Sequence, residues 1–213
     1  MPENRDPALP WLLFDIGGVL ITRPDDIGAI SRALDPDAPG GEDAEARVRD
    51  AFDAHREPYD RGGSAREFWE AVARDLGLPA PGEDDLAELI AIEQRRWGAP
   101  DDQTLAALDR AVAAGYPLAI LSNAPHELAD VLEDPAGWGA RFQVVLVSAR
   151  MGKAKPDADV WPHAVERLGS PADRIVFVDD KPANVDAARA AGIHAHVWEG
   201  LGTLDRILDG TLA

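Results

Sequence analysis

The sequence predicts an α/β fold built on a parallel sheet, and two observations carry that prediction. Short apolar runs alternate with stretches of helical pattern over much of the chain. The runs end at turns and do not alternate with polar residues, as expected of strands that are buried on both faces. Such an alternation requires right-handed crossovers within one sheet. We therefore expect a Rossmann-like parallel sheet that carries a helical insert.

The apolar runs give the expected strands. These are residues 12–14, 116–121, 142–147, 174–178 and 193–197. The stretches between them favour helices because their apolar residues recur at helical spacing. These helices are expected at 104–114, 125–132, 159–168 and 182–191.

A block from residue 27 to residue 97 interrupts this alternation directly after the first strand, and its pattern is helical throughout. Ser64 and Glu67 have the spacing of a capping box, which predicts a helix over 64–76. The other expected features of this region are helices over 44–52 and from Asp84 or Asp85 onward, loops at 35–41 and 79–82, and a polar break at 22–26. We therefore divide the chain into an α/β core domain, residues 1–22 and 99–213, and a helical cap domain, residues 23–98.

Composition restricts the partners of the protein. Its 213 residues include 39 acidic and 21 basic side chains, which give a net charge of −18. This charge disfavours nucleic acid and anionic membranes as partners, and solubility is its simplest explanation. The absence of cysteine excludes disulfides and thiolate catalysis. Residues 1–10 lack the features of a signal peptide, and the apolar stretch 9–21 is too short to span a bilayer. We expect a cytoplasmic protein, and the sequence carries no signal for an oligomeric state.

Polar residues follow several of the expected strands. They are Asp15, Ser122, Lys155, Asp179 and Asp180. In a parallel α/β sheet, ligands bind beyond the carboxyl ends of the strands, so these side chains are expected to converge. A carboxylate, a hydroxyl, an ammonium group and a carboxylate pair together suit phosphoryl transfer through an aspartate.

Two acidic motifs carry most of this chemistry. Asp15 stands at the tip of a strand before Gly17 and Gly18, which would let a ligand approach the backbone, although a simple glycine turn would look the same. The pair Asp179 and Asp180 ends an apolar strand, where two carboxylates repel each other unless a cation neutralises them. Oxygen ligands favour Mg²⁺, and the alternative is an acidic turn before the helix that begins at residue 182.

The remaining motifs suit binding of a phosphoryl group. Ser122 and Asn123 follow a strand and precede a helix, where a hydroxyl and backbone amides would hold phosphoryl oxygens or simply cap the helix. Lys155 precedes Pro156, which restricts the backbone of Lys155 and would aim its side chain. An ammonium group there would limit the repulsion between a nucleophilic carboxylate and a phosphate.

In this order, the motifs resemble those of the haloacid dehalogenase-like hydrolase superfamily, whose members are mostly Mg²⁺-dependent phosphatases. The resemblance covers essentially the whole chain, and segments 59–62 and 67–69 are similar to the cap of the branch that includes sugar-phosphate phosphatases. The resemblance implies that Asp15 attacks the phosphoryl group and forms an aspartyl-phosphate, while Ser122 and Lys155 hold its oxygens. It also implies that Mg²⁺ is bound by Asp15, by the carbonyl of Gly17 and by Asp180, with Asp179 as a further ligand or neighbour.

The sequence departs from this family at Gly17, where most members have an aspartate that donates and accepts protons. Such acid–base assistance contributes about 10²–10⁴-fold to the rate. Water, the substrate, Asp60 or His55 are the candidates to replace it. Asp60 and Arg61 begin a turn that is expected either to contact the substrate or to serve as an ordinary connection between helices.

We therefore expect a phosphomonoesterase that acts on a small phosphorylated metabolite, such as a sugar phosphate. Two alternatives stay open: a catalytically impaired relative that binds a phosphorylated ligand or partner, and a haloacid dehalogenase, for which the acidic pair would be superfluous. A phospho-receiver domain is excluded because its acidic pair precedes its phosphorylated aspartate, whereas here Asp15 precedes Asp179 and Asp180.

Overall fold

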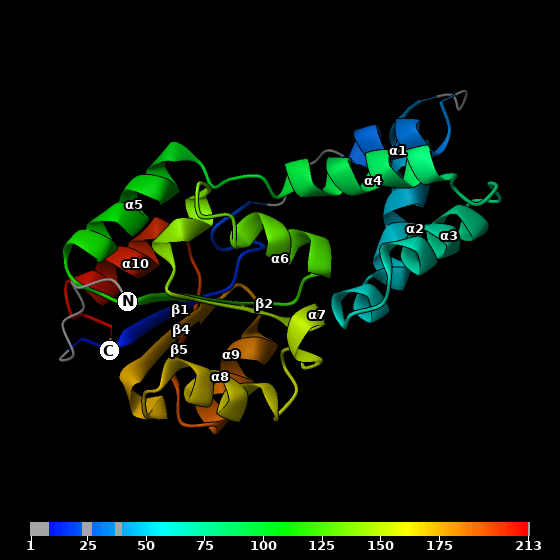
Figure 1. Cartoon of the computed structure of the whole chain (residues 1–213). Helices are drawn as coiled ribbons and strands as arrows, with labels where there is room; N and C mark the ends of the chain where they lie inside the picture. The colour runs from blue at the N-terminus through cyan, green and yellow to red at the C-terminus, as the bar shows by residue number, and fades with distance from the viewer. Residues whose placement is uncertain (1–8, 23–26, 37–39, 213) are drawn as a thin grey trace.

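The computed structural model describes residues 9–22, 27–36 and 40–212. In this part of the chain, five parallel strands form one sheet in the order β3-β2-β1-β4-β5 (Figure 1). The strands are β1 (Trp11–Phe14), β2 (Leu118–Ser122), β3 (Val144–Val147), β4 (Ile175–Asp179) and β5 (His194–Val197). All five overlap the strands expected from the apolar runs, and the predicted α/β class is confirmed.

Helices cover both faces of the sheet, which explains why β1 to β4 are almost entirely apolar, whereas the edge strand β5 contains His194 and His196. Leu12 and Phe14 of β1 point to one face, where they join a hydrophobic cluster with α5 (Asp102–Ala113), α6 (His126–Leu132) and α10 (Leu201–Leu208). Leu13 points to the other face, toward α8 (Val160–Leu168) and α9 (Pro182–Ala190). Figure 1 shows the two helical layers on opposite sides of the strands.

Among the described residues between β1 and α5, four helices pack around a hydrophobic cluster of their own and extend away from the sheet (Figure 1). They are α1 (Ile27–Leu34), α2 (Glu42–Asp60), α3 (Ala65–Asp75) and α4 (Glu83–Arg96). Phe52, Phe68 and Trp69 form the aromatic centre of this cluster, with ring centroids 4.8–5.8 Å apart. The insertion therefore folds as a helical unit, as its uninterrupted helical pattern predicts.

Some helix boundaries differ from the predicted ones. The capping box of α3 is present, with the Ser64 and Glu67 side chains each accepting a hydrogen bond from the other residue's backbone amide. Helix α4 begins at Glu83, before the predicted start at Asp84 or Asp85, because the Asp85 carboxylate accepts a hydrogen bond from the Gly82 amide. Helix α2 is much longer than the predicted 44–52.

Two helices were not predicted, α7 (Ser148–Met151) and α10, and two short 3₁₀ turns lie at Trp138–Arg141 and Ala172–Arg174. Most of the predicted break at 22–26, the first residues of the predicted cap and the centre of the predicted loop at 35–41 lie outside the described residues. Within the described residues, no helix combines the length and the apolar character needed to cross a membrane.

Candidate active site

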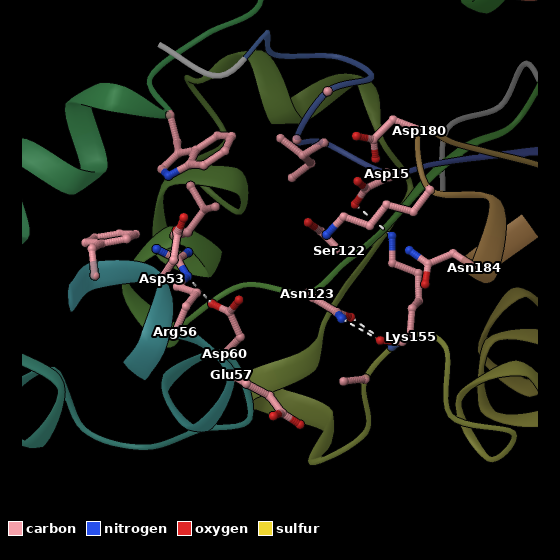
Figure 2. Close-up of a pocket in the computed structure, with 18 of the residues that line it drawn as sticks. Asp15, Asp53, Arg56, Glu57, Asp60, Ser122, Asn123, Lys155, Asp180 and Asn184 are labelled. Atoms are coloured by element: carbon pink, nitrogen blue, oxygen red, sulfur yellow. Dashed lines mark hydrogen bonds and ion pairs between the residues drawn. The ribbon is translucent and has the colours of Figure 1, made fainter. Parts of the chain in front are cut away.

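All the predicted site residues except Asp179 line a pocket of about 840 Å³ between the carboxyl ends of the strands and helices α2 and α4, and Asp179 is buried beside it. Asp15 follows β1, Ser122 ends β2, and Asp179 ends β4. The parallel register aligns these ends, since Phe14 pairs with both Ile120 and Val178. Figure 2 shows the side chains of Asp15, Ser122 and Lys155 directed toward one another.

A buried lysine joins two of the carboxylates. The Lys155 Nζ atom lies 2.7 Å from Asp15 Oδ1 and 2.6 Å from Asp179 Oδ2, and the lysine side chain is 1% exposed. Burial raises the pKa of Asp15, and the Lys155 ammonium opposes that rise. This ion pair favours the ionised form of Asp15, which a nucleophilic carboxylate requires.

Asp179 is enclosed by hydrogen-bond donors. Its side chain is 0% exposed, and besides Lys155 it accepts hydrogen bonds from the Lys181 amide at 2.8 Å and from Asn184 Nδ2 at 2.9 and 3.0 Å. Both carboxylate oxygens are therefore occupied by this chain's own donors. The arrangement lets Asp179 hold Lys155 in position beside Asp15.

Asp180 is exposed to the pocket and lies against the glycine turn after β1. A Cβ atom on Gly18 would stand only 2.5 Å from Asp180 Oδ2, and Gly18 has a φ of +79°, so glycine is required there twice over. Burial, Asp15 and Asp179 raise the pKa of Asp180, in that order of size. Repulsion among the carboxylates thus opposes the charged form of Asp180 unless a cation is bound.

The acidic cluster fits a divalent cation. Asp15, Asp179 and Asp180 each offer a carboxylate oxygen, and these three oxygens lie within 4.8 Å of one another. One lysine does not neutralise three carboxylates, and hard oxygen ligands suit Mg²⁺. Both carboxylate oxygens of Asp179 already accept hydrogen bonds from Lys155, Lys181 and Asn184. Asp15 and Asp180 are therefore the carboxylates of this cluster with an oxygen available to a cation.

Ser122 and Asn123 differ in their surroundings. Ser122 is buried and lines the pocket beside Lys155. Asn123 exchanges two hydrogen bonds with the backbone of Lys155, to its carbonyl at 2.7 Å and from its amide at 2.8 Å. The Asn123 side chain therefore positions Lys155. The alternative of a cap formed by Ser122 or Asn123 is wrong, because α6 begins at His126 with Pro125 as its N-cap.

Gly17 lies beneath an aromatic side chain. A Cβ atom on Gly17 would stand 3.3 Å from Cη2 of Trp97, which follows α4. The Trp97 Nε1 atom donates a hydrogen bond of 3.0 Å to Glu93 Oε1, which fixes the indole. A side chain at position 17 would therefore have to displace a held tryptophan.

The helical unit contributes Asp60 and Arg61 to the pocket. Asp60 ends α2 and pairs with Arg56 at 2.7 Å, and Figure 2 shows both on the α2 side of the pocket, across from Asp15 and Ser122. Arg61 pairs with Glu57 and with Asp157 of the core, at 3.0 and 2.8 Å. His55 pairs with Asp75 at 2.7 Å and is not among the residues that line the pocket.

Several residues around the site had no predicted role. Arg56, Glu93 and Trp97 form a network of the helical unit, Ser148 connects this unit to the core, and Asn184 holds Asp179. The pairs Arg56–Asp60 and Glu93–Trp97 are each four residues apart, a spacing that brings side chains together on a helix, and Asn184 is five residues after Asp179. The contacts of Arg56 with Glu93 and of Ser148 with Asp60 join segments that are distant in the sequence.

The fold and this arrangement of a buried aspartate, a lysine and an acidic pair define a hydrolase of the α/β class. The sequence matches the haloacid dehalogenase-like hydrolase family over residues 10–192. The chain therefore belongs to this family, as its motifs suggested.

The relatives of this chain include phosphatases and a dehalogenase. Phosphatase MT3486 of Mycobacterium tuberculosis is 32% identical over 158 residues, which cover 68% of this chain and 70% of that protein. N-acetylmuramic acid 6-phosphate phosphatase of Pseudomonas aeruginosa is 27% identical over 193 residues, covering 86% and 79%. (S)-2-haloacid dehalogenase H-109 of Pseudomonas putida is 32% identical over 94 residues, covering 44% and 42%.

Solved structures have the same fold. A HAD-like hydrolase of Porphyromonas gingivalis superposes with a TM-score of 0.70 at 21% identity, covering 94% of this chain and 98% of that one. A HAD family enzyme of Bacteroides thetaiotaomicron, in complex with magnesium and inorganic phosphate, has a TM-score of 0.64 at 19% identity, covering 89% and 94%.

Proposed function

We propose that this protein is a Mg²⁺-dependent phosphomonoesterase that acts on a small phosphorylated metabolite. The observation that carries the proposal is the bridge of Lys155 between Asp15 and Asp179, with Asp180 beside it at the ends of the strands. The phosphatases among the relatives support the reaction type, and the magnesium complex of a structural neighbour is consistent with the metal.

In the proposed reaction, Asp15 attacks phosphorus and forms an aspartyl-phosphate, which water then hydrolyses. Ser122 and Lys155 hold the phosphoryl oxygens, and Asn123 and Asp179 keep Lys155 in place. Asp15, Asp180 and the carbonyl of Gly17 would hold Mg²⁺. The bound ion supplies neutralisation of the charge on the transferring group. Asp179 completes the cluster chiefly through Lys155.

The four-helix unit is proposed to act as the cap, over residues 23–98. Besides the pair of Arg61 with Asp157, its described residues form hydrogen bonds with the core. Tyr59 donates to Glu127 at 2.9 Å, Gln94 donates to the Glu127 carbonyl at 3.0 Å, and the Asp60 carbonyl accepts from Ser148 of the core at 2.5 Å. A cap held this closely restricts the pocket to small molecules and excludes water during phosphoryl transfer.

Turnover of p-nitrophenyl phosphate tests the proposal, because its leaving group needs no protonation. We expect hydrolysis that requires both Mg²⁺ and Asp15, so that EDTA or the Asp15→Asn substitution abolishes it. Binding of phosphate without any turnover would support a non-catalytic relative instead. Release of halide from 2-chloropropionate without added metal would support a dehalogenase.

A further inference from the structure

The pocket contains a buried carboxyl group to which the proposed reaction gives no role. The cap contributes three acidic side chains to the described pocket lining: Asp53, Glu57 and Asp60. Asp53 and Glu57 are exposed, whereas the Asp60 side chain is 15% exposed. Asp60 therefore combines access to the pocket with shielding from bulk water.

Asp60 is fixed relative to the phosphoryl-binding end of β2. Its backbone carbonyl accepts a hydrogen bond of 2.5 Å from Ser148 Oγ, and that hydroxyl also accepts one of 2.9 Å from the amide of Ala124. Ala124 is two residues after Ser122. A Cβ atom on Gly62 would stand 3.0 Å from the Ala149 carbonyl, so the turn after Asp60 lies directly on the core.

The charges around Asp60 favour a carboxyl group that exchanges its proton near neutral pH. Burial raises its pKa to about 6, against the opposing effects of Arg56 and, more weakly, of Lys181, while Glu93 adds to the rise. Glu93 also pairs with Arg56 and Arg96, at 2.5 and 3.0 Å, and so shares the positive charge of Arg56. Asp60 and Asp180 line the same pocket, and Figure 2 shows Asp60 on the α2 side, across from Asp15.

We propose that Asp60 is the proton donor and acceptor of this hydrolase, supplied by the cap because Trp97 covers position 17. This inference rests on the proposed phosphatase function. As the Asp15 oxygen bonds to phosphorus and the ester P–O bond breaks, the Asp60 carboxylic acid gives its proton to the departing oxygen. The Asp60 carboxylate then takes a proton from the water that attacks the aspartyl-phosphate, which releases phosphate and restores Asp15.

A comparison of phenyl phosphate with p-nitrophenyl phosphate tests this role, because the two esters are similar in shape. Phenol is about as weak an acid as the tyrosine side chain, with a pKa of about 10, so phenoxide leaves slowly without a proton. In Asp60→Asn, we expect kcat/KM for phenyl phosphate to fall about 10²-fold and kcat/KM for p-nitrophenyl phosphate to change little, because kcat/KM reports the step in which the alcohol departs. The kcat values of both esters should fall, because both pass through the same aspartyl-phosphate, whose hydrolysis also uses Asp60.

The matched control is His55→Gln, on the same helix, which is expected to leave the turnover of both esters unchanged.

The pH profile is a second readout. In the wild type, kcat/KM for phenyl phosphate should decline as the pH rises above about 6, and this decline should be absent in Asp60→Asn. Retained turnover of p-nitrophenyl phosphate shows that the variant is folded. Equal losses of kcat/KM on both esters, no loss of kcat/KM on either, a wild type inactive on phenyl phosphate, or a selective loss in His55→Gln would each overturn the role of Asp60. Absence of all turnover in the wild type would instead refute the phosphatase function itself.

Discussion

Gly17 and Gly18 follow each other in the sequence, yet a side chain is opposed at each for a different reason and to a different degree. At Gly18, the left-handed φ of +79° and the carboxylate of Asp180 both exclude a side chain. At Gly17, the backbone would accept other residues, and only the ring of Trp97 occupies the space. Substitutions at the two positions therefore have different expected effects.

For Gly18→Ala, we expect a loss of Mg²⁺ affinity and of Mg²⁺-dependent activity by at least about tenfold, because the new methyl group displaces Asp180. Gly210→Ala is the control, since Gly210 has a similar φ of +77° but no atom within 4 Å of the position that a methyl group would take. Both variants should lose about 1 kcal/mol of stability from backbone strain. Isothermal titration with Mg²⁺ separates them, and equal affinities would contradict the contact with Asp180.

For Gly17→Asp, which introduces the residue usual in this family, we expect a loss of about 1–3 kcal/mol in stability and no gain in activity. The side chain must push aside an indole that Glu93 holds. Gly202→Asp serves as the control, because the space around Gly202 is open. Urea unfolding measures the stability, and phenyl phosphate turnover measures the activity. An increase in turnover would contradict the prediction and show that the Trp97 ring moves aside at little cost.

At the scale of elements, helices α2 and α4 enclose a charged network within an otherwise apolar bundle. Arg56 lies over the rings of Phe52 and Tyr59, with its guanidinium carbon 5.3 and 5.7 Å from their centroids. Glu93 holds this arginine, Arg96 and Trp97 together. Arg56 pairs with both Asp60 and Glu93. The positive charge of Arg56 therefore offsets only part of the cost of burying the Asp60 carboxylate.

This predicts an unusual pH dependence of stability. The pKa of Asp60 rises from 3.8 to about 6 on folding, so the unfolded chain releases the proton first, and stability falls as the pH rises from about 4 to about 6. At about 1.4 kcal/mol per pKa unit, the penalty at pH 7 is about 3 kcal/mol. Asp60→Asn should therefore gain about that much relative to the wild type between pH 4 and pH 7 in urea unfolding. A difference in the free energy of unfolding between the two proteins that stays constant from pH 4 to pH 7 would contradict the raised pKa of Asp60.

The helices and strands also show which parts of the fold and of the site could be predicted from the sequence alone. Apolar runs predicted β1 to β4 because strands buried on both faces need few polar residues, and the parallel sheet then brings Asp15, Ser122 and Asp179 to one edge. The prediction also located β5, although this edge strand contains His194 and His196. Helix α7 has only four residues, too few to show a period. The contacts of Asp60 with Ser148, and of Gly17 with Trp97, join segments about 80 residues apart, which no local pattern reveals.

For the whole molecule, the net charge of −18 means that divalent cations can associate without a specific site. We expect Mg²⁺ at about 100 times its Kd to stabilise the native protein by about 2.7 kcal/mol and to raise its Tm by about 5–10 °C. Asp180→Asn should remove most of this increase. Asp159→Asn, which changes an exposed carboxylate paired with Lys153, should preserve it. Equal increases in both variants would indicate non-specific association, and differential scanning fluorimetry measures all three proteins.

The hydroxyl of Ser148 connects the two parts of the molecule, because it serves the cap and the segment after Ser122 at once. A movement of the cap away from the core must break the hydrogen bond from the Ser148 hydroxyl to the Asp60 carbonyl. The Ser148 hydroxyl, which also accepts a hydrogen bond from the Ala124 amide, is then free to rotate. In the proposed reaction, departure of the product and relaxation of the segment after Ser122 would consequently be one event. The same movement would carry Asp60 away from Asp15, so that under our proposal Asp60 would deliver no proton while the pocket is open to solvent.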